Sequence, residues 1–149
     1  MKENDFSINI YLLFIFIEFF YKKSIVLYEQ LNKARMLMEK ALIIKKEWLQ
    51  KIFSHGKIWE MRSSKTNIRG KIKLIESGSG LIVGECEIID SIKPSKKDIS
   101  NHQDLHQVSE LLLLEKWCHA WVLKNPIKYN SPIPYKHPQG AVIWVNLKL

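Results

Sequence analysis

The sequence is short of cysteines and has no long apolar run, and both shortages restrict the class of protein. Cys86 and Cys118 lie far apart and form no CxxC pair, so neighbouring residues cannot build a zinc knuckle or a redox motif. We interpret both as buried thiols in a reducing compartment, which predicts a cytoplasmic protein. The apolar run at 8–20 (INIYLLFIFIEFF) contains Glu18 and is shorter than the roughly 18 to 20 residues of a membrane span. No A-x-A pattern follows it, so neither a secretory signal nor a stable membrane span is expected.

Acidic side chains are also scarce relative to basic ones. The chain has 15 acidic and 23 basic residues, a net charge of +8, and this excess favours polyanionic partners, with nucleic acid ahead of an anionic membrane. A length of 149 residues with 46% hydrophobic and 26% charged residues is typical of one globular core. A disordered chain and a disulfide-stapled miniprotein are therefore excluded.

The aromatic residues divide the chain in two. Five of the six phenylalanines fall in the first 20 residues, whereas all five tryptophans lie between Trp48 and Trp144. We therefore predict an N-terminal hydrophobic extension, residues 1–37, and a domain, residues 38–149, with Met36 and Met38 as candidate internal starts. The extension has three interpretations: a helix packed on the domain, a weak membrane anchor, or a leader read from upstream of the natural start. The first and third are preferred over the anchor.

Periodicity in residues 38–149 predicts a mixed α+β fold. Trp48, Leu49, Ile52 and Phe53 recur at helical spacing before Gly56, which predicts a short helix. Alternating or apolar stretches predict strands at 57–62, 70–76, 81–89, 120–123 and 140–147, the last of them buried, with a hairpin turn at 77–80. One helix or two short ones are expected between 97 and 117. Four prolines at 126–138 predict an extended loop that cannot join a central strand.

Three motifs fail on inspection. The glycines of 78–84 (GSGLIVG) do not have dinucleotide-loop spacing and are better explained as a turn. His102 and His106 have the i, i+4 spacing of a zinc helix, but Gln103 stands where a metalloprotease needs its glutamate. There is no G-x-S-x-G elbow. No metal site and no cofactor are predicted.

From residue 41 onward the sequence resembles the ASCH domain family, a branch of the PUA-like fold, over about residues 40–148. The stretches that carry the resemblance are ALIIKKEW at 41–48, GKIWEMRS at 56–63, Arg69 with Gly70, GECEIID at 84–90, AWVL at 120–123, PYKHPQG at 134–140 and Trp144. The resemblance implies a small mixed β-barrel with flanking helices. It also implies a cleft, formed by residues 56–63 and the proline-rich loop, that binds RNA or acts on nucleotides. Residues 1–37 have no counterpart in the family.

The candidate site begins with a dense group of cations. Six basic residues lie between Lys57 and Lys73, against Glu60 as the only acid, and this density beside Trp59 suits phosphate attraction with an aromatic surface for a base. The alternative is that Trp59 belongs to the core and the lysines form a solvated strand face. Candidate nucleic-acid-binding residues are Lys57, Glu60, Arg62, Lys65 and Arg69, together with Tyr135 and His137, which the resemblance places on the loop facing the cleft.

Glu60 has two interpretations. Its carboxylate can accept hydrogen bonds from the polar edge of a base while Arg62 or Lys57 holds phosphate, or it can form an ion pair with Arg62 alone. Tyr135 and His137 can contact the same ligand or anchor the loop between Pro134 and Pro138.

The resemblance also suggests an enzyme. Some relatives are amidohydrolases acting on acylated cytidine with a lysine, a threonine three residues later, and a glutamate; Lys57 matches the lysine, Glu60 replaces the threonine, and Glu110 and Glu115 are candidates for the third group. Other relatives are nucleases, for which Glu60, His137 and Lys57 could supply acid and base. We predict a module that binds RNA or a nucleotide, with a modified base as one candidate ligand. A hydrolase is the alternative, and a basic protein-interaction module is the third class.

Overall fold

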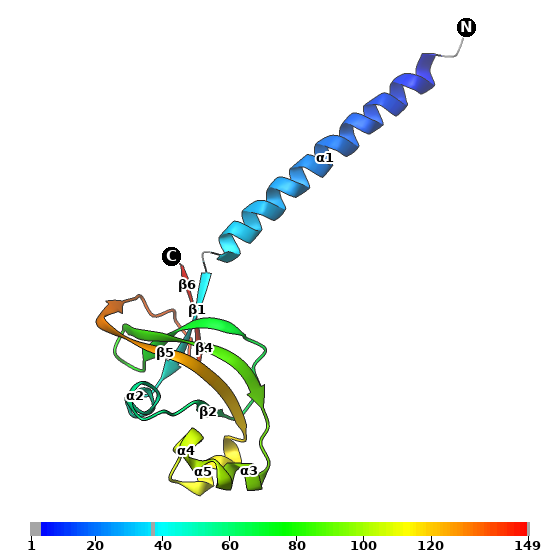
Figure 1. Ribbon diagram of the computed structural model, residues 1–149. Coiled ribbons are helices and arrows are strands. Elements are labelled where there is room, and N and C mark those ends of the chain that lie inside the picture. The colour runs from blue at the N-terminus through cyan, green and yellow to red at the C-terminus, as the bar shows by residue number, and fades with distance from the viewer. Residues whose placement is uncertain (1–3, 37, 149) are drawn as a thin grey trace. The chain divides into compact units, whose positions relative to one another are not determined.

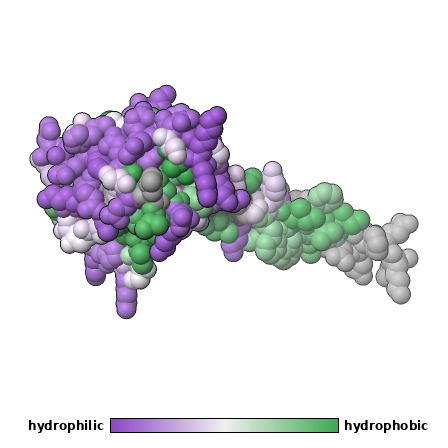
Figure 2. Space-filling view, turned by 90° about the horizontal axis from the view of Figure 1, so that it is seen from below, coloured by the Kyte–Doolittle hydropathy of each residue, from purple (hydrophilic) through white to green (hydrophobic). Residues whose placement is uncertain are grey.

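The computed structural model describes residues 4–36 and 38–148, which divide into two units (Figure 1). The first contains a single long helix, α1 (Asn4–Met36). Its four consecutive residues Leu12 to Ile15 are all exposed, so apolar side chains lie on every face of the helix, and Figure 2 shows this apolar surface in green. In the described ranges no helix has the length and apolar character of a membrane span. The role of residues 1–37 stays a prediction.

The second unit, residues 39–147, is built on a six-stranded sheet with the order β2-β5-β4-β3-β1-β6. β1 and β3 are parallel, whereas β3 with β4, β4 with β5 and β2 with β5 are antiparallel. The strands are β1 (Met38–Ile44), β2 (Trp59–Arg62), β3 (Gly70–Glu76), β4 (Leu81–Ile92), β5 (His119–Pro134) and β6 (Trp144–Lys148). The helices are α2 (Lys46–Ser54), α3 (Lys96–Asn101), α4 (Gln103–His106) and α5 (Leu111–Lys116). The predicted α+β class is confirmed.

Several local predictions are confirmed as well. The helical spacing after Lys45 forms α2, which buries Leu49 and Ile52 against the sheet. β3 and β4 form the predicted hairpin, and its turn contains Gly78 and Gly80 at φ of 78° and 71°. These positive angles suit glycine because it has no Cβ to clash with the backbone. Between 97 and 117 the chain forms three short helices, one more than expected.

The sheet is open, whereas a barrel was expected. Across the described residues, β2 and β6 are the two edges of the sheet, and closure would require backbone pairing between them. β2 has only four residues. β2 contacts β1 through a side chain: the Arg62 guanidinium donates a hydrogen bond to the carbonyl oxygen of Ile43 (3.2 Å). The cavity described below lies beside this opening.

The proline-rich segment was predicted wrongly. Residues 125–134 belong to β5 and pair with β4 as far as Pro134 opposite Leu81. A proline in a strand is tolerated where its missing N–H has no partner to satisfy. β2 covers β5 only at residues 119–122, so the rest of β5 has β4 on one side and no paired strand on the other among the described residues. Only the part after Pro134 is a loop.

The last strand is shorter and more exposed than expected. β6 begins at Trp144, while Val142 is 77% exposed. Val145 and Leu147 are buried and alternate with exposed Asn146 and Lys148, because β6 is an edge strand with one solvated face.

Candidate functional site

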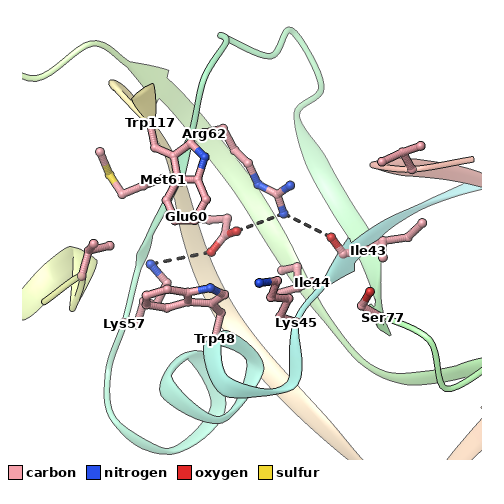
Figure 3. Close-up of a pocket in the computed structure, with 12 residues that line it drawn as sticks. Ile43, Ile44, Lys45, Trp48, Lys57, Glu60, Met61, Arg62, Ser77 and Trp117 are labelled. Atoms are coloured by element: carbon pink, nitrogen blue, oxygen red, sulfur yellow. Dashed lines mark hydrogen bonds and ion pairs between the residues drawn. The ribbon is translucent and has the colours of Figure 1, made fainter. Parts of the chain in front are cut away.

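A cavity of about 230 Å³ lies where the end of β1 and the start of α2 approach β2 (Figure 3). We call it the Lys57 cavity. Three charged side chains, Lys57, Glu60 and Arg62, meet on one of its walls. The remaining lining residues come from several segments of the chain and are Ile43, Ile44, Lys45, Trp48, Met61, Ser77, Val108, Trp117 and Val142.

Lys57 is buried, with a relative exposure of 1%. It follows Gly56, whose φ of 73° turns the chain after α2, and its backbone N–H donates to the carbonyl of Lys51 (3.1 Å). Its ammonium group donates to the carbonyl oxygens of Trp59 and of His106, the latter at 2.8 Å. Burial lowers the pKa of Lys57 to about 8, and the nearby Glu60 carboxylate partly opposes this shift.

His106 holds the segment that receives the Lys57 ammonium. Its Nδ1 accepts a hydrogen bond from the backbone N–H of Val108 (3.0 Å), so its Nε2 carries the proton and donates to the carbonyl of Ile99 (3.0 Å). Burial lowers the pKa of His106, which favours this neutral tautomer. His106 is thus a structural residue.

Glu60 joins the two cations. It lies on β2 opposite Trp121 and is 5% exposed. One carboxylate oxygen lies 3.0 Å from the terminal nitrogen of Arg62, and the other lies 3.6 Å from the Lys57 ammonium. Two-residue periodicity puts Lys57 on the opposite face from Glu60, but Lys57 precedes the first residue of β2, so the alternation does not apply to it.

Arg62 completes the array and lies nearest to solvent. Its side chain is 20% exposed, and its guanidinium carbon lies 5.4 Å from the ring centroid of Trp121. The Arg62 Nε is buried and has no hydrogen-bond partner in the described structure. With both cations charged, the array carries one net positive charge, so it suits a ligand that brings acceptor atoms or negative charge.

Two indoles form the aromatic part of the cavity wall. Trp48 and Trp117 are partly buried and meet edge to face, with ring centroids 6.4 Å apart. In Figure 3 the Glu60 carboxylate points into the space beside them. Of the two interpretations of Trp59, a surface for a base or a core residue, the second is confirmed. Trp59 is 8% exposed and packs in a core cluster with Met61.

The other predicted cations lie outside the cavity. Lys65 and Arg69 belong to the loop between β2 and β3 and do not line it. Arg69 pairs with Asp90 (3.2 Å) and also donates to the carbonyl of Thr66 (2.9 Å). Lys73 is held by Glu85 (2.7 Å). The cation-rich stretch is therefore divided among several contacts, and only Lys57 and Arg62 of its six cations reach the cavity.

Tyr135 and His137 lie in a second, adjoining cavity of about 590 Å³, which we call the His137 groove. The Tyr135 hydroxyl lies 2.8 Å from His137 Nδ1, and His137 Nε2 lies 3.0 Å from the carbonyl oxygen of Ala141. The pair therefore anchors its loop, and it also lines the groove. Burial raises the pKa of Tyr135.

The groups proposed for other chemistry do not converge. Glu110 and Glu115 are exposed and do not line the Lys57 cavity. Within residues 4–36 and 38–148 no cluster of histidine, cysteine, aspartate or glutamate could hold a metal ion. Sequence reasoning missed Lys45, Ser77 and Trp117 as lining residues. Lys45 lies in the stretch 41–48 that carries the family resemblance and Ser77 in the predicted turn at 77–80, a kind of segment that often positions functional groups.

Comparison with known proteins supports one family. The model of the ASCH domain family matches residues 42–133. A solved ASCH protein from Zymomonas mobilis has 16% sequence identity and a TM-score of 0.55, covering 73% of this chain and 87% of that chain. Its serine-to-alanine variant has 15% identity and a TM-score of 0.56, covering 73% and 87%. Its tyrosine-to-phenylalanine variant has 16% identity and a TM-score of 0.54, covering 73% and 89%. No curated protein sequence matches the chain.

Proposed function

This chain belongs to the ASCH domain family, and we propose that it binds RNA or a nucleotide by taking one base into the Lys57 cavity. The family is generally thought to bind RNA. The observation that carries the proposal is the Lys57, Glu60 and Arg62 array beside two indoles in one cavity. Such a combination of charge, acceptor and aromatic surface matches the polar edge and apolar faces of a nucleobase.

The size of the cavity limits the ligand part that enters it. A volume of about 230 Å³ is below the range of about 300 to 1,000 Å³ in which drug-sized ligands are bound. A single base fits this scale, whereas a folded or double-stranded RNA element does not. The protein therefore recognises an unpaired base, with the rest of the ligand outside.

Glu60 is the residue that reads the base. An ionised carboxylate only accepts hydrogen bonds, so it favours a base edge that presents donors such as an exocyclic amine or a ring N–H. Arg62 offers donors next to it, including the Nε that has no partner in the described structure. The ion pairs with Arg62 and Lys57 hold the Glu60 carboxylate in position for this role.

We propose that Lys65 and Arg69 bind the part of the RNA that lies outside the cavity. Both are exposed, and they would attract the phosphates of a longer RNA without reading its sequence. A cytoplasmic location goes with the same proposal, and the two free cysteines support it.

A hydrolase is the second candidate, and the lowered pKa of Lys57, about 8, favours it. A lysine with such a pKa is partly neutral near physiological pH and can act as a base. Against this, Glu60 occupies the threonine position, and Lys57 is only 1% exposed. Binding is therefore the conclusion, and turnover is an outcome for the experiment to detect.

The experiment is a binding panel of the four nucleosides and their 5′-monophosphates on wild type, Glu60→Gln and Glu47→Gln. Glu47 is an exposed acid in the first turn of α2 and does not line the cavity, so its substitution controls for the change of charge. Glu60→Gln should change the order of base preference, because an amide donates as well as accepts. Glu47→Gln should leave the order unchanged, and thermal melting checks folding.

Identical preferences in a folded Glu60→Gln variant would contradict base reading by Glu60. Time-dependent product from RNA or from acylated cytidine, lost in Glu60→Gln, would establish the hydrolase instead.

A further inference from the structure

We infer that the ligand occupies two neighbouring subsites, so that the natural ligand is a dinucleotide segment or longer single-stranded RNA instead of a free nucleotide. This inference rests on the proposed function and adds a second site to it. Its starting point is that the Lys57 cavity and the His137 groove share three lining residues, Ile43, Ser77 and Val142. A ligand that leaves one cavity past these residues enters the other.

The Lys57 cavity also has side chains that can hold the phosphate between two nucleosides, namely the shared residue Ser77 and Lys45, which lines this cavity alone. Lys45 lies at the junction of β1 and α2, is exposed, and lines the Lys57 cavity together with Ser77. Ser77 is held against the end of β1, because its backbone N–H donates to the carbonyl of Ile44 (2.9 Å). An exposed ammonium group and a hydroxyl that line the same cavity suit a phosphodiester, which presents acceptor oxygens and one negative charge.

The groove itself offers a fixed acceptor. Carbonyl oxygens only accept hydrogen bonds, so His137 Nε2 carries the proton that it donates to Ala141. In the neutral imidazole Nδ1 then accepts from the Tyr135 hydroxyl, which leaves the lone pairs of the Tyr135 oxygen for another donor. A ribose hydroxyl is such a donor.

A backbone hydrogen bond also holds the loop that lines the groove. The backbone N–H of Tyr135 donates to the carbonyl of Gly80 (3.1 Å), which ties the loop to the turn between β3 and β4. The groove volume of about 590 Å³ exceeds that of the Lys57 cavity, so it has room for a nucleoside whose base is not read closely. We therefore place the selected base in the Lys57 cavity and its neighbour in the groove.

The test compares nucleoside 5′-monophosphates with the four homodinucleotides ApA, CpC, GpG and UpU by calorimetry at one salt concentration. The preferred dinucleotide should bind about tenfold more tightly than its monophosphate, which corresponds to about one additional net hydrogen bond with its contacts. His137→Ala should remove most of this advantage, because His137 lines the groove and not the Lys57 cavity.

Lys45→Gln and Lys46→Gln form a matched pair for the phosphate. The two lysines are adjacent and exposed, but Lys46 lines neither cavity. Lys45→Gln should weaken dinucleotide binding several-fold and Lys46→Gln should not. Equal binding of dinucleotide and monophosphate, or equal loss in the two lysine variants, would overturn the second subsite while leaving the proposed function intact. Failure of every nucleotide to bind would overturn both.

Discussion

Lys57 places a charge in one of the least accessible positions of the protein, and its ionisation should be measurable in stability. The pKa of Lys57 is about 8 in the folded protein, mainly because of burial, against an ordinary value of 10.5. Between these values the unfolded chain binds more protons than the folded one. The contribution of Lys57 to the unfolding free energy therefore rises with pH from about 8 to about 10.5, by about 3 kcal/mol if the whole shift is realised.

Urea denaturation of wild type and Lys57→Met across this pH range checks the prediction. Other groups also titrate there, so the relevant quantity is the difference in unfolding free energy between the two proteins. The unfolding free energy of wild type should increase relative to that of Lys57→Met as the pH rises. A difference that does not change with pH would show that Lys57 titrates normally in the folded protein.

Some residues of the site could be predicted from the sequence and others could not. Lys57, Glu60 and Arg62 occur within six positions, so a local reading can group them. Trp59 lies among them but faces the core, because the side of a strand that is covered depends on helices more than 35 positions later in the chain. Lys45 and Trp117 reach the cavity only through folding.

At the scale of elements, the close pairing of β4 with β5 depends on Gly84. A Cβ at this position would overlap the carbonyl oxygen of Ile127 and lie 2.6 Å from the ring of Phe53. Because the first of these is backbone, the overlap cannot be relieved by a side-chain rotation. Gly84→Ala should lower the unfolding free energy by about 1 to 3 kcal/mol.

Denaturant midpoints measure this effect, with Ser131→Ala as the control. Ser131 is exposed on β5, so its substitution should change stability by less than about 0.5 kcal/mol. If Gly84→Ala is no less stable than Ser131→Ala, the claim that β4 and β5 approach too closely at Gly84 to admit a Cβ is contradicted.

The elements themselves were predicted unevenly, and the reason is physical. α2 and the hairpin of β3 and β4 depend on local periodicity and turn residues, which a sequence displays directly. The length of β5 depends on where its pairing with β2 stops. Its prolines are tolerated only beyond that point, where β5 has β4 on one side and no paired strand among the described residues on the other. The open sheet likewise depends on how far β2 extends, which local patterns do not specify.

At the scale of the whole molecule, the second unit has a hydrophobic core of its own. Among the residues that the structure describes, three hydrophobic clusters form, and their members lie between Ala41 and Leu147. A chain that begins at Met38 should therefore fold with a cooperative thermal transition. Loss of that transition, with the full chain still folded, would make residues 1–37 part of the folded core.

Binding of a base in the Lys57 cavity is the central claim, and the tryptophans provide its most direct test. Trp48 and Trp117 line the cavity, whereas Trp59 and Trp144 do not. The measurement is an NMR titration of the five indole N–H signals with short single-stranded RNA, assigned with Trp48→Phe and Trp117→Phe. Saturable shifts of the Trp48 and Trp117 signals, with the Trp144 signal unchanged, are the predicted result. Saturable binding that leaves both cavity signals in place, or no binding at all, would contradict the claim.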